Sequence, residues 1–165
     1  MIASEKNIAR DEDMRTVGSQ LAKRLLLADP GAIVITLQGE LGAGKTTLVR
    51  GLLNALGITG AVRSPTYTLI ETYEFPQRRI YHLDLYRLGS AADLEGLGLR
   101  DLLEEDSILL IEWPEKGGDQ LPPADLKLEL HYASPGRRLV FRPLTRTGEF
   151  LVQSLESMDK SPLSP

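Results

Sequence analysis

The residues with the clearest chemistry lie between Gly39 and Thr46, where GELGAGKT matches the pattern G-x-x-x-x-G-K-[ST] without a gap. The glycines let backbone N–H groups approach phosphate oxygens, and a helix starting here would add the positive end of its dipole. Lys45 is then expected to reach the β- and γ-phosphates of a nucleotide, while the Thr46 hydroxyl binds Mg²⁺. The predicted nucleotide-binding residues of this segment are Gly39, Glu40, Leu41, Gly42, Ala43, Gly44, Lys45, Thr46 and Thr47.

Two carboxylates are candidates to hold that metal ion. Glu112 ends the apolar run Ile108–Ile111, and acidic residues at the ends of buried strands lie on the ligand side of open α/β sheets. A charge beside such a run needs a partner, which Mg²⁺ or one of its waters would supply. Asp84 shares one face of an alternating segment with His82 and Tyr86, a pattern that an ordinary solvated edge residue would also give.

The sequence says less about the base of the nucleotide. The guanine-specific pattern N-K-x-D does not occur, and Asp93–Gly96, although it spells D-x-x-G, follows Gly89–Ala92 rather than a strand. We interpret this stretch as part of a helix, which disfavours an ordinary GTPase and leaves ATP as the expected nucleotide.

The segment Arg63–Tyr67 (RSPTY) follows the helix predicted after the glycine segment. A threonine-bearing loop in this position can sense a γ-phosphate and its magnesium, although a proline turn that enters a strand would give the same sequence. Ser64 and Thr66 are the candidate switch residues. Arg63 and Arg87 are the nearby cations, for which surface roles are the commoner alternative.

The chain has two histidines, His82 and His131, and both fall in strand patterns. Neither is spaced with carboxylates as a metal site requires. We therefore assign both to packing or to the surface.

Several strands and helices must position these groups. Ala32–Gln38 and Ser107–Trp113 are short apolar runs typical of buried strands, and the first leads into the glycine segment. Tyr67–Phe75 and Arg79–Leu85 predict an antiparallel pair because the turn between them is short. The other predicted elements are strands over 4–9, 126–132 and 138–142, helices over 46–56 and from Asp11, helical turns over 91–105, a loop over 116–123 and a last short helix around 150–155.

Length and composition narrow the class of protein. The chain has 165 residues and 18.2 kDa, which predicts one domain over 1–156 and a flexible tail over 157–165. It has no cysteine, no secretory leader and no apolar run near the ~20 residues that cross a bilayer, so we expect a cytoplasmic protein without membrane contact. A net charge of −4 argues against binding of nucleic acid without a partner protein.

Four segments together resemble one family. GELGAGKTT (39–47), SPTYTLIETY (64–73), HLDLYRL (82–88) and IEWPE (111–115) stand in the order and spacing of TsaE, also called YjeE. These are the small bacterial ATPases of tRNA threonylcarbamoyladenosine synthesis. The first segment is common to many families and the other three are far more specific. The likeness runs from about Asp11 to Leu155.

The resemblance implies an α/β, P-loop NTPase-like fold, with a mostly parallel central sheet flanked by helices and an antiparallel hairpin extension. It implies ATP and Mg²⁺ as ligands and slow hydrolysis by the chain alone. It also implies stimulation within a threonylcarbamoyl transferase complex, whose TsaD- and TsaB-type subunits would be the partners. tRNA would be met only indirectly.

By the same resemblance, Lys45, Asp84 and Glu112 correspond to catalytic residues. Asp84 would either orient the attacking water or support the metal that Thr46 and Glu112 hold. The remaining matches are Thr16 and Arg137 at the nucleotide, Thr66 in the switch region and Trp113 beside the site.

Other functions share the same phosphate site. A P-loop kinase for a small molecule would need an acceptor pocket and usually an arginine-bearing lid, whereas the loop 116–123 carries only Lys116. A nucleotide-dependent interaction module would need binding without cleavage. A module that binds tRNA directly is disfavoured by the acidic balance.

Overall fold

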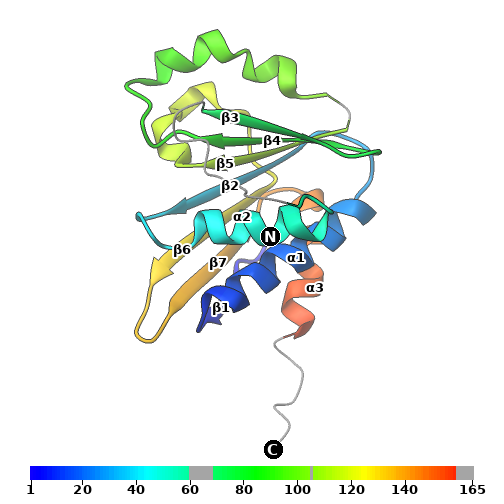
Figure 1. Ribbon diagram of the computed structural model, residues 1–165, viewed down its shortest axis with the longest axis vertical. Coiled ribbons are helices and arrows are strands. Elements are labelled where there is room, and N and C mark those ends of the chain that lie inside the picture. The colour runs from blue at the N-terminus through cyan, green and yellow to red at the C-terminus, as the bar shows by residue number, and fades with distance from the viewer. Residues whose placement is uncertain (60–68, 105, 159–165) are drawn as a thin grey trace, which may run out of the picture.

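The computed structural model describes residues 1–59, 69–104 and 106–158. Strands and α-helices follow one another along the chain as shown in Figure 1. The strands are β1 (Ser4–Ile8), β2 (Ile33–Gly39), β3 (Ile70–Glu74), β4 (Arg79–Asp84), β5 (Ser107–Glu112), β6 (Leu126–Tyr132) and β7 (Arg137–Pro143). The α-helices are α1 (Asp11–Leu27), α2 (Lys45–Ala55) and α3 (Arg146–Met158), and the 3₁₀ helices are η1 (Ala91–Leu97), η2 (Leu99–Leu102), η3 (Pro114–Lys116) and η4 (Gly118–Gln120).

The strands form one sheet in the order β1-β7-β6-β2-β5-β4-β3. The four central strands β6, β2, β5 and β4 are parallel to one another, and antiparallel strands flank them on both sides. The predicted hairpin of β3 and β4 is confirmed. The sheet as a whole is mixed, because the short turn at 133–136 folds β7 back on β6, and β1 then pairs with β7.

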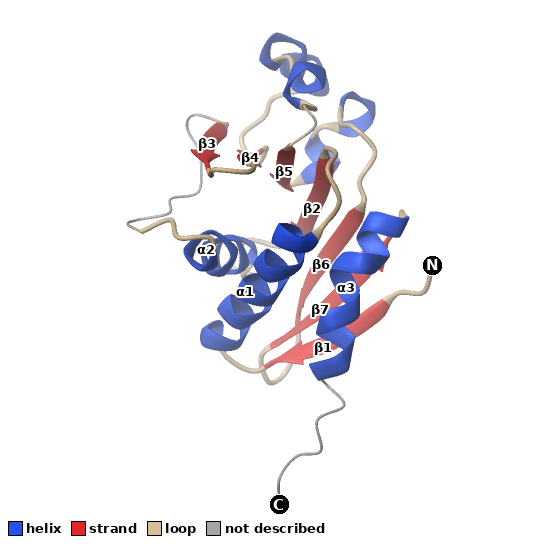
Figure 2. Cartoon of the chain, turned by 90° about the vertical axis from the view of Figure 1, so that its right-hand side faces the viewer, coloured by secondary structure: helices blue, strands red, loops and turns tan. Residues whose placement is uncertain are grey.

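Helices cover the two faces of the sheet unequally. On one face α1, α2 and α3 pack against the strands, as Figure 2 shows, and the predicted apolar side of α1 lies in this core. On the other face Leu94 of η1 and Leu99 of η2 share a second apolar cluster with β2, β4 and β5, and Ile70 of β3 packs against it. The same face of β6 and β7 carries exposed charged side chains such as Lys127 and Arg138.

Two glycines bring α1 and α2 into backbone contact. A Cβ atom built on Gly18 would lie 2.1 Å from the carbonyl oxygen of Leu48, and one on Gly51 would lie 2.2 Å from that of Arg15. Real Cβ atoms do not approach so closely, so only glycine allows this packing. The contact fixes α1 against the helix that begins with Lys45.

Some elements differ from the sequence expectation. The capping box of Ser90 and Asp93 is present, and Gly98 in a left-handed conformation (φ 60°) separates the two helical segments of 91–102, both of which are 3₁₀ helices rather than α-helices. The loop after β5 contains two further 3₁₀ turns, η3 and η4. Helix α3 runs to Met158, two residues beyond the predicted end of the domain. Within the described ranges, no helix combines the length and the apolar character needed to cross a bilayer.

Candidate active site

The glycine-rich loop joins the end of β2 at Gly39 to the start of α2 at Lys45, as the sequence predicts. Gly42 and Gly44 adopt positive φ angles of 77° and 110°, which side-chain-bearing residues rarely adopt. A Cβ on Gly39 would lie 2.6 Å from the carbonyl oxygen of Leu130 on β6. The glycines therefore serve both the turn of the loop and its contact with the neighbouring strand.

Lys45 is almost fully buried, with 5% of its surface exposed. Its ammonium donates hydrogen bonds to the carbonyl oxygens of Gly39 and Glu40 and lies 4.2 Å from the ring centroid of Trp113. Burial lowers the pKa of Lys45, and the nearby carboxylates, Glu112 first among them, oppose that shift. The loop thus holds a desolvated cation at its centre.

The two predicted acids lie side by side. Asp84 ends β4, Glu112 ends β5, and the parallel register pairs them directly. They are 5% and 2% exposed. The Thr46 hydroxyl donates to Oε1 of Glu112 over 3.2 Å, and Asp84 accepts a hydrogen bond from the backbone N–H of Tyr86. The structure therefore brings the whole predicted metal group to one place.

His82 also lies beside this group, a contact that its assignment to packing or to the surface did not include. It lies two residues before Asp84 on β4 and is fully buried. Its Nε2 atom is 2.5 Å from Oε2 of Glu112. Sequence alternation places His82 on the face of Asp84, but the pairing of β4 with β5, which joins it to Glu112, is not visible in the sequence.

The β6–β7 hairpin holds the tip of the loop. The Tyr132 hydroxyl donates to the carbonyl oxygen of Leu41, and the Arg137 guanidinium donates to that of Gly42 over 3.2 Å. The guanidinium also lies 4.4 Å from the ring centroid of Tyr132. Arg137 therefore lies at the loop, as predicted, and Tyr132 is a contact that sequence reasoning missed.

Trp113 closes the site beside Lys45, as predicted. Its backbone has a left-handed conformation (φ 58°), and its N–H donates to the carbonyl oxygen of Leu37 on β2. Its ring contacts that of Tyr86, with centroids 4.9 Å apart. The turn after β5 thus places an aromatic ring over the buried ammonium.

A cavity of about 510 Å³ unites these groups. Its lining includes the loop residues Leu41, Gly42 and Gly44–Thr47 and the outlying residues Asp84, Glu112, Trp113 and Arg137. Asp11, at the start of α1, lines it too, and nothing in the sequence pattern marked this residue beyond its place at a helix start.

The oxygen donors at this cavity suit Mg²⁺ that keeps water and phosphate ligands, rather than a metal ion that is coordinated by protein side chains alone. In the described part of the chain, no group of three or more His, Cys, Asp or Glu side chains could hold a metal ion. Magnesium in phosphate sites takes one or two carboxylates and keeps waters and phosphate oxygens as its other ligands. Thr46, Glu112 and Asp84 supply donors of that kind.

Among the described residues, four of the predicted nucleotide-binding residues do not line this cavity: Thr16, Gly39, Glu40 and Ala43. Thr16 lies on the exposed side of α1, where its hydroxyl donates to the carbonyl oxygen of Glu12, and it is not among the cavity-lining residues. Ser64 and Thr66 lie outside the described residues, as does Arg63. The roles of Thr16, Ser64 and Thr66 remain predictions.

Comparison with known proteins identifies the family. Residues 8–140 match the family model described as threonylcarbamoyl adenosine biosynthesis protein TsaE. Proteins named tRNA threonylcarbamoyladenosine biosynthesis protein TsaE are 43% identical in Haemophilus influenzae, over 87% of this chain and 92% of that protein, and 35% identical in Bacillus subtilis, over 88% and 94%. The crystal structure of Bacillus subtilis YdiB superposes with a TM-score of 0.77 and 27% identity, covering 96% of this chain and 97% of that one. The chain therefore belongs to the TsaE family.

Proposed function

We propose that the chain binds ATP with Mg²⁺ in this cavity and hydrolyses the bond between its β- and γ-phosphates. One observation carries the proposal: a buried lysine and two adjacent buried carboxylates line the same cavity as a glycine-rich loop at the start of a helix. An isolated buried charge is costly, so such a group indicates a site built for a charged ligand.

The loop and α2 bind the phosphates. Backbone N–H groups of the loop and the N-terminus of α2 favour negative charge, which makes the segment the P-loop of this chain. Lys45 already points at the loop's own carbonyl oxygens, and phosphate oxygens would take over these hydrogen bonds. Its positive charge then stabilises the negative charge that spreads over the γ-phosphoryl group during transfer.

Thr46 and Glu112 hold the metal, Glu112 either directly or through a water. When bound, Mg²⁺ neutralises charge on the phosphate oxygens. Asp84, held by the backbone N–H of Tyr86, orients the attacking water or supports the metal from beside Glu112. Arg137 contacts the nucleotide from the hairpin, and Ser64 and Thr66 sense its γ-phosphate.

The relatives' name supports a place in tRNA modification. We infer that hydrolysis by this chain drives turnover of a threonylcarbamoyl transferase complex with TsaD- and TsaB-type subunits in the cytoplasm. The net charge of −4 fits a protein that meets tRNA only through such partners.

The test measures phosphate release from ATP by the purified chain, alone and with the transferase subunits. We expect slow release that the subunits stimulate and that requires Mg²⁺. Lys45→Ala should lose it, and the control Lys127→Ala, an exposed lysine on β6, should keep it.

Two results would contradict the proposal. A phosphorylated small molecule formed in place of free phosphate would identify a kinase. Normal tRNA modification by a variant that binds ATP without cleaving it would identify an interaction module.

A further inference from the structure

We propose that His82 is a positioning residue that fixes the carboxylate of Glu112 for the metal ion. The inference rests on the proposed function, because it concerns how the magnesium-binding carboxylate is held. His82 and Glu112 face the α1 and α2 side of the sheet from neighbouring strands, in line with the core residues Ile80 and Leu110.

The two oxygens of Glu112 have different partners. Oε1 accepts a hydrogen bond from the Thr46 hydroxyl at the start of α2, and Oε2 lies 2.5 Å from Nε2 of His82 on β4. One oxygen is thereby directed to the loop, and the other is held away from it. This arrangement presents a single, defined oxygen at the position where the metal is expected.

The chemistry of the pair sets the direction of the hydrogen bond. An ionised carboxylate can only accept, so Nε2 of His82 carries the proton. In the part of the chain that the structure describes, Nδ1 of His82 is buried without a hydrogen-bond partner. Nε2 is therefore the only ring nitrogen of His82 with a partner among these residues, and that partner is Glu112.

The bond matters because the hydrogen bond from Thr46 alone holds only one oxygen of the carboxylate. Rotation about the last side-chain torsion of glutamate has broad, shallow minima, so packing alone does not fix its plane. Groups that hydrogen-bond to a metal's ligands orient them, and their loss typically costs 10–100-fold in metal affinity. His82 fills this place for Glu112.

Magnesium titration tests the inference without measuring hydrolysis. Trp113 is the only tryptophan of the chain and lies beside the site, so its fluorescence reports binding of a non-hydrolysable ATP analogue. His82→Leu should raise the Mg²⁺ concentration for half-saturation by about 10–100-fold. His82→Gln, whose amide can donate to the same oxygen, should restore most of this loss, and the exposed control His131→Gln should change nothing.

The outcomes separate this inference from the proposed function. If the unmodified chain needs no Mg²⁺ to bind the analogue, the role of His82 and the proposed function are both contradicted. If the unmodified chain needs Mg²⁺, and a folded His82→Leu variant is half-saturated at the same Mg²⁺ concentration, only the role of His82 is overturned. A loss that His82→Gln does not restore also contradicts the inference, because it would show packing rather than hydrogen bonding.

Nitrogen NMR of the intact chain decides the case if His82→Leu fails to fold. With His131→Gln in place, His82 is the only histidine. We expect a proton on Nε2 that exchanges slowly with water. A ring protonated on Nδ1 alone would overturn the inference.

Discussion

Two glutamate–histidine pairs occur among the residues that the structure describes, and their surroundings differ completely. In the candidate active site, His82 and Glu112 are 2.5 Å apart with 0% and 2% of their side chains exposed. On the open face of the sheet, His131 and Glu129 are 3.4 Å apart with 45% and 23% exposed. Burial, and not residue type, separates the pair in the candidate site from the surface pair.

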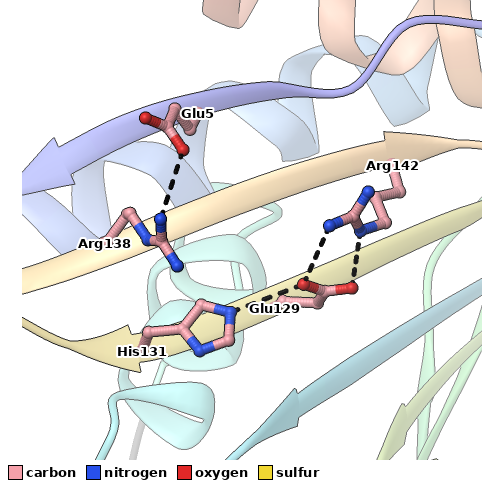
Figure 3. Close-up of polar contacts among 5 residues, drawn as sticks. All are labelled: Glu5, Glu129, His131, Arg138 and Arg142. Carbon is pink, nitrogen blue, oxygen red and sulfur yellow. Dashed lines mark hydrogen bonds and ion pairs between the residues drawn. The ribbon is translucent and has the colours of Figure 1, made fainter.

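The open pair belongs to a row of charges on β1, β6 and β7, shown in Figure 3. Arg142 donates to Glu129 over 2.6 Å, and Arg138 lies 3.8 Å from Glu5. The hydrogen bond from Arg142 lowers the pKa of Glu129. Such exposed pairs exchange partners with water at little cost, so this face keeps the uncovered part of the sheet solvated.

The two glutamates are expected to differ most in their effect on the rate of ATP hydrolysis. Glu112→Gln keeps the shape of the side chain and removes its charge, so phosphate release with partners should fall about 10²–10³-fold, as when a group that stabilises a transition state is removed. Glu129→Gln should leave the rate unchanged. Equal rates for the two variants would contradict the site assignment.

The second contrast is in stability. Breaking a buried pair leaves an uncompensated polar group, whereas replacing both members by apolar residues does not. A double-mutant cycle of His82→Leu and Glu112→Leu should show coupling of about 2 kcal/mol in urea unfolding. The cycle of His131→Leu and Glu129→Leu should stay within about 0.5 kcal/mol. Similar coupling in both cycles would remove the distinction.

Burial of the Lys45 ammonium predicts that its replacement stabilises the chain. The pKa of Lys45 lies below its ordinary 10.5, so folding disfavours the charged ammonium and stability should rise as pH increases through the lowered value. Lys45→Met should therefore stabilise the nucleotide-free chain by about 1 kcal/mol at neutral pH, while nucleotide binding is lost. Urea unfolding measures this, with the exposed Lys127→Met as control. A less stable Lys45→Met variant would show that the ammonium contributes more than its burial costs.

The smallest effect belongs to the open face. The pKa of Glu129 lies below its ordinary 4.5, so its contribution to stability is complete above that value and is lost as pH falls through the lowered one. Arg142→Ala should lower the urea midpoint slightly at neutral pH, and the difference should vanish in acid. A difference that persists once Glu129 is protonated would assign the effect to packing of the arginine stem.

The sequence predicted the local parts of the site and missed the pairings between distant strands. The turn from β2 through Gly42 and Gly44 into α2 follows from contiguous residues, and the ends of β4 and β5 were predicted to within one residue. The antiparallel pairing of β1 with β7 depends on contacts between the two ends of the chain, so no local pattern reveals it. His82 was missed for the same reason, because only the register of β4 on β5 brings it to Glu112.

The glycine contact between α1 and α2 has a mechanical consequence. Asp11 at one end of α1 and Lys45 at the start of α2 line the same cavity, and the touching backbones at Gly18 and Gly51 prevent the two helices from sliding past each other. The cavity mouth is therefore carried by a single stiff unit. A methyl group at either glycine would force α1 and α2 apart, and with them the two ends that line the cavity.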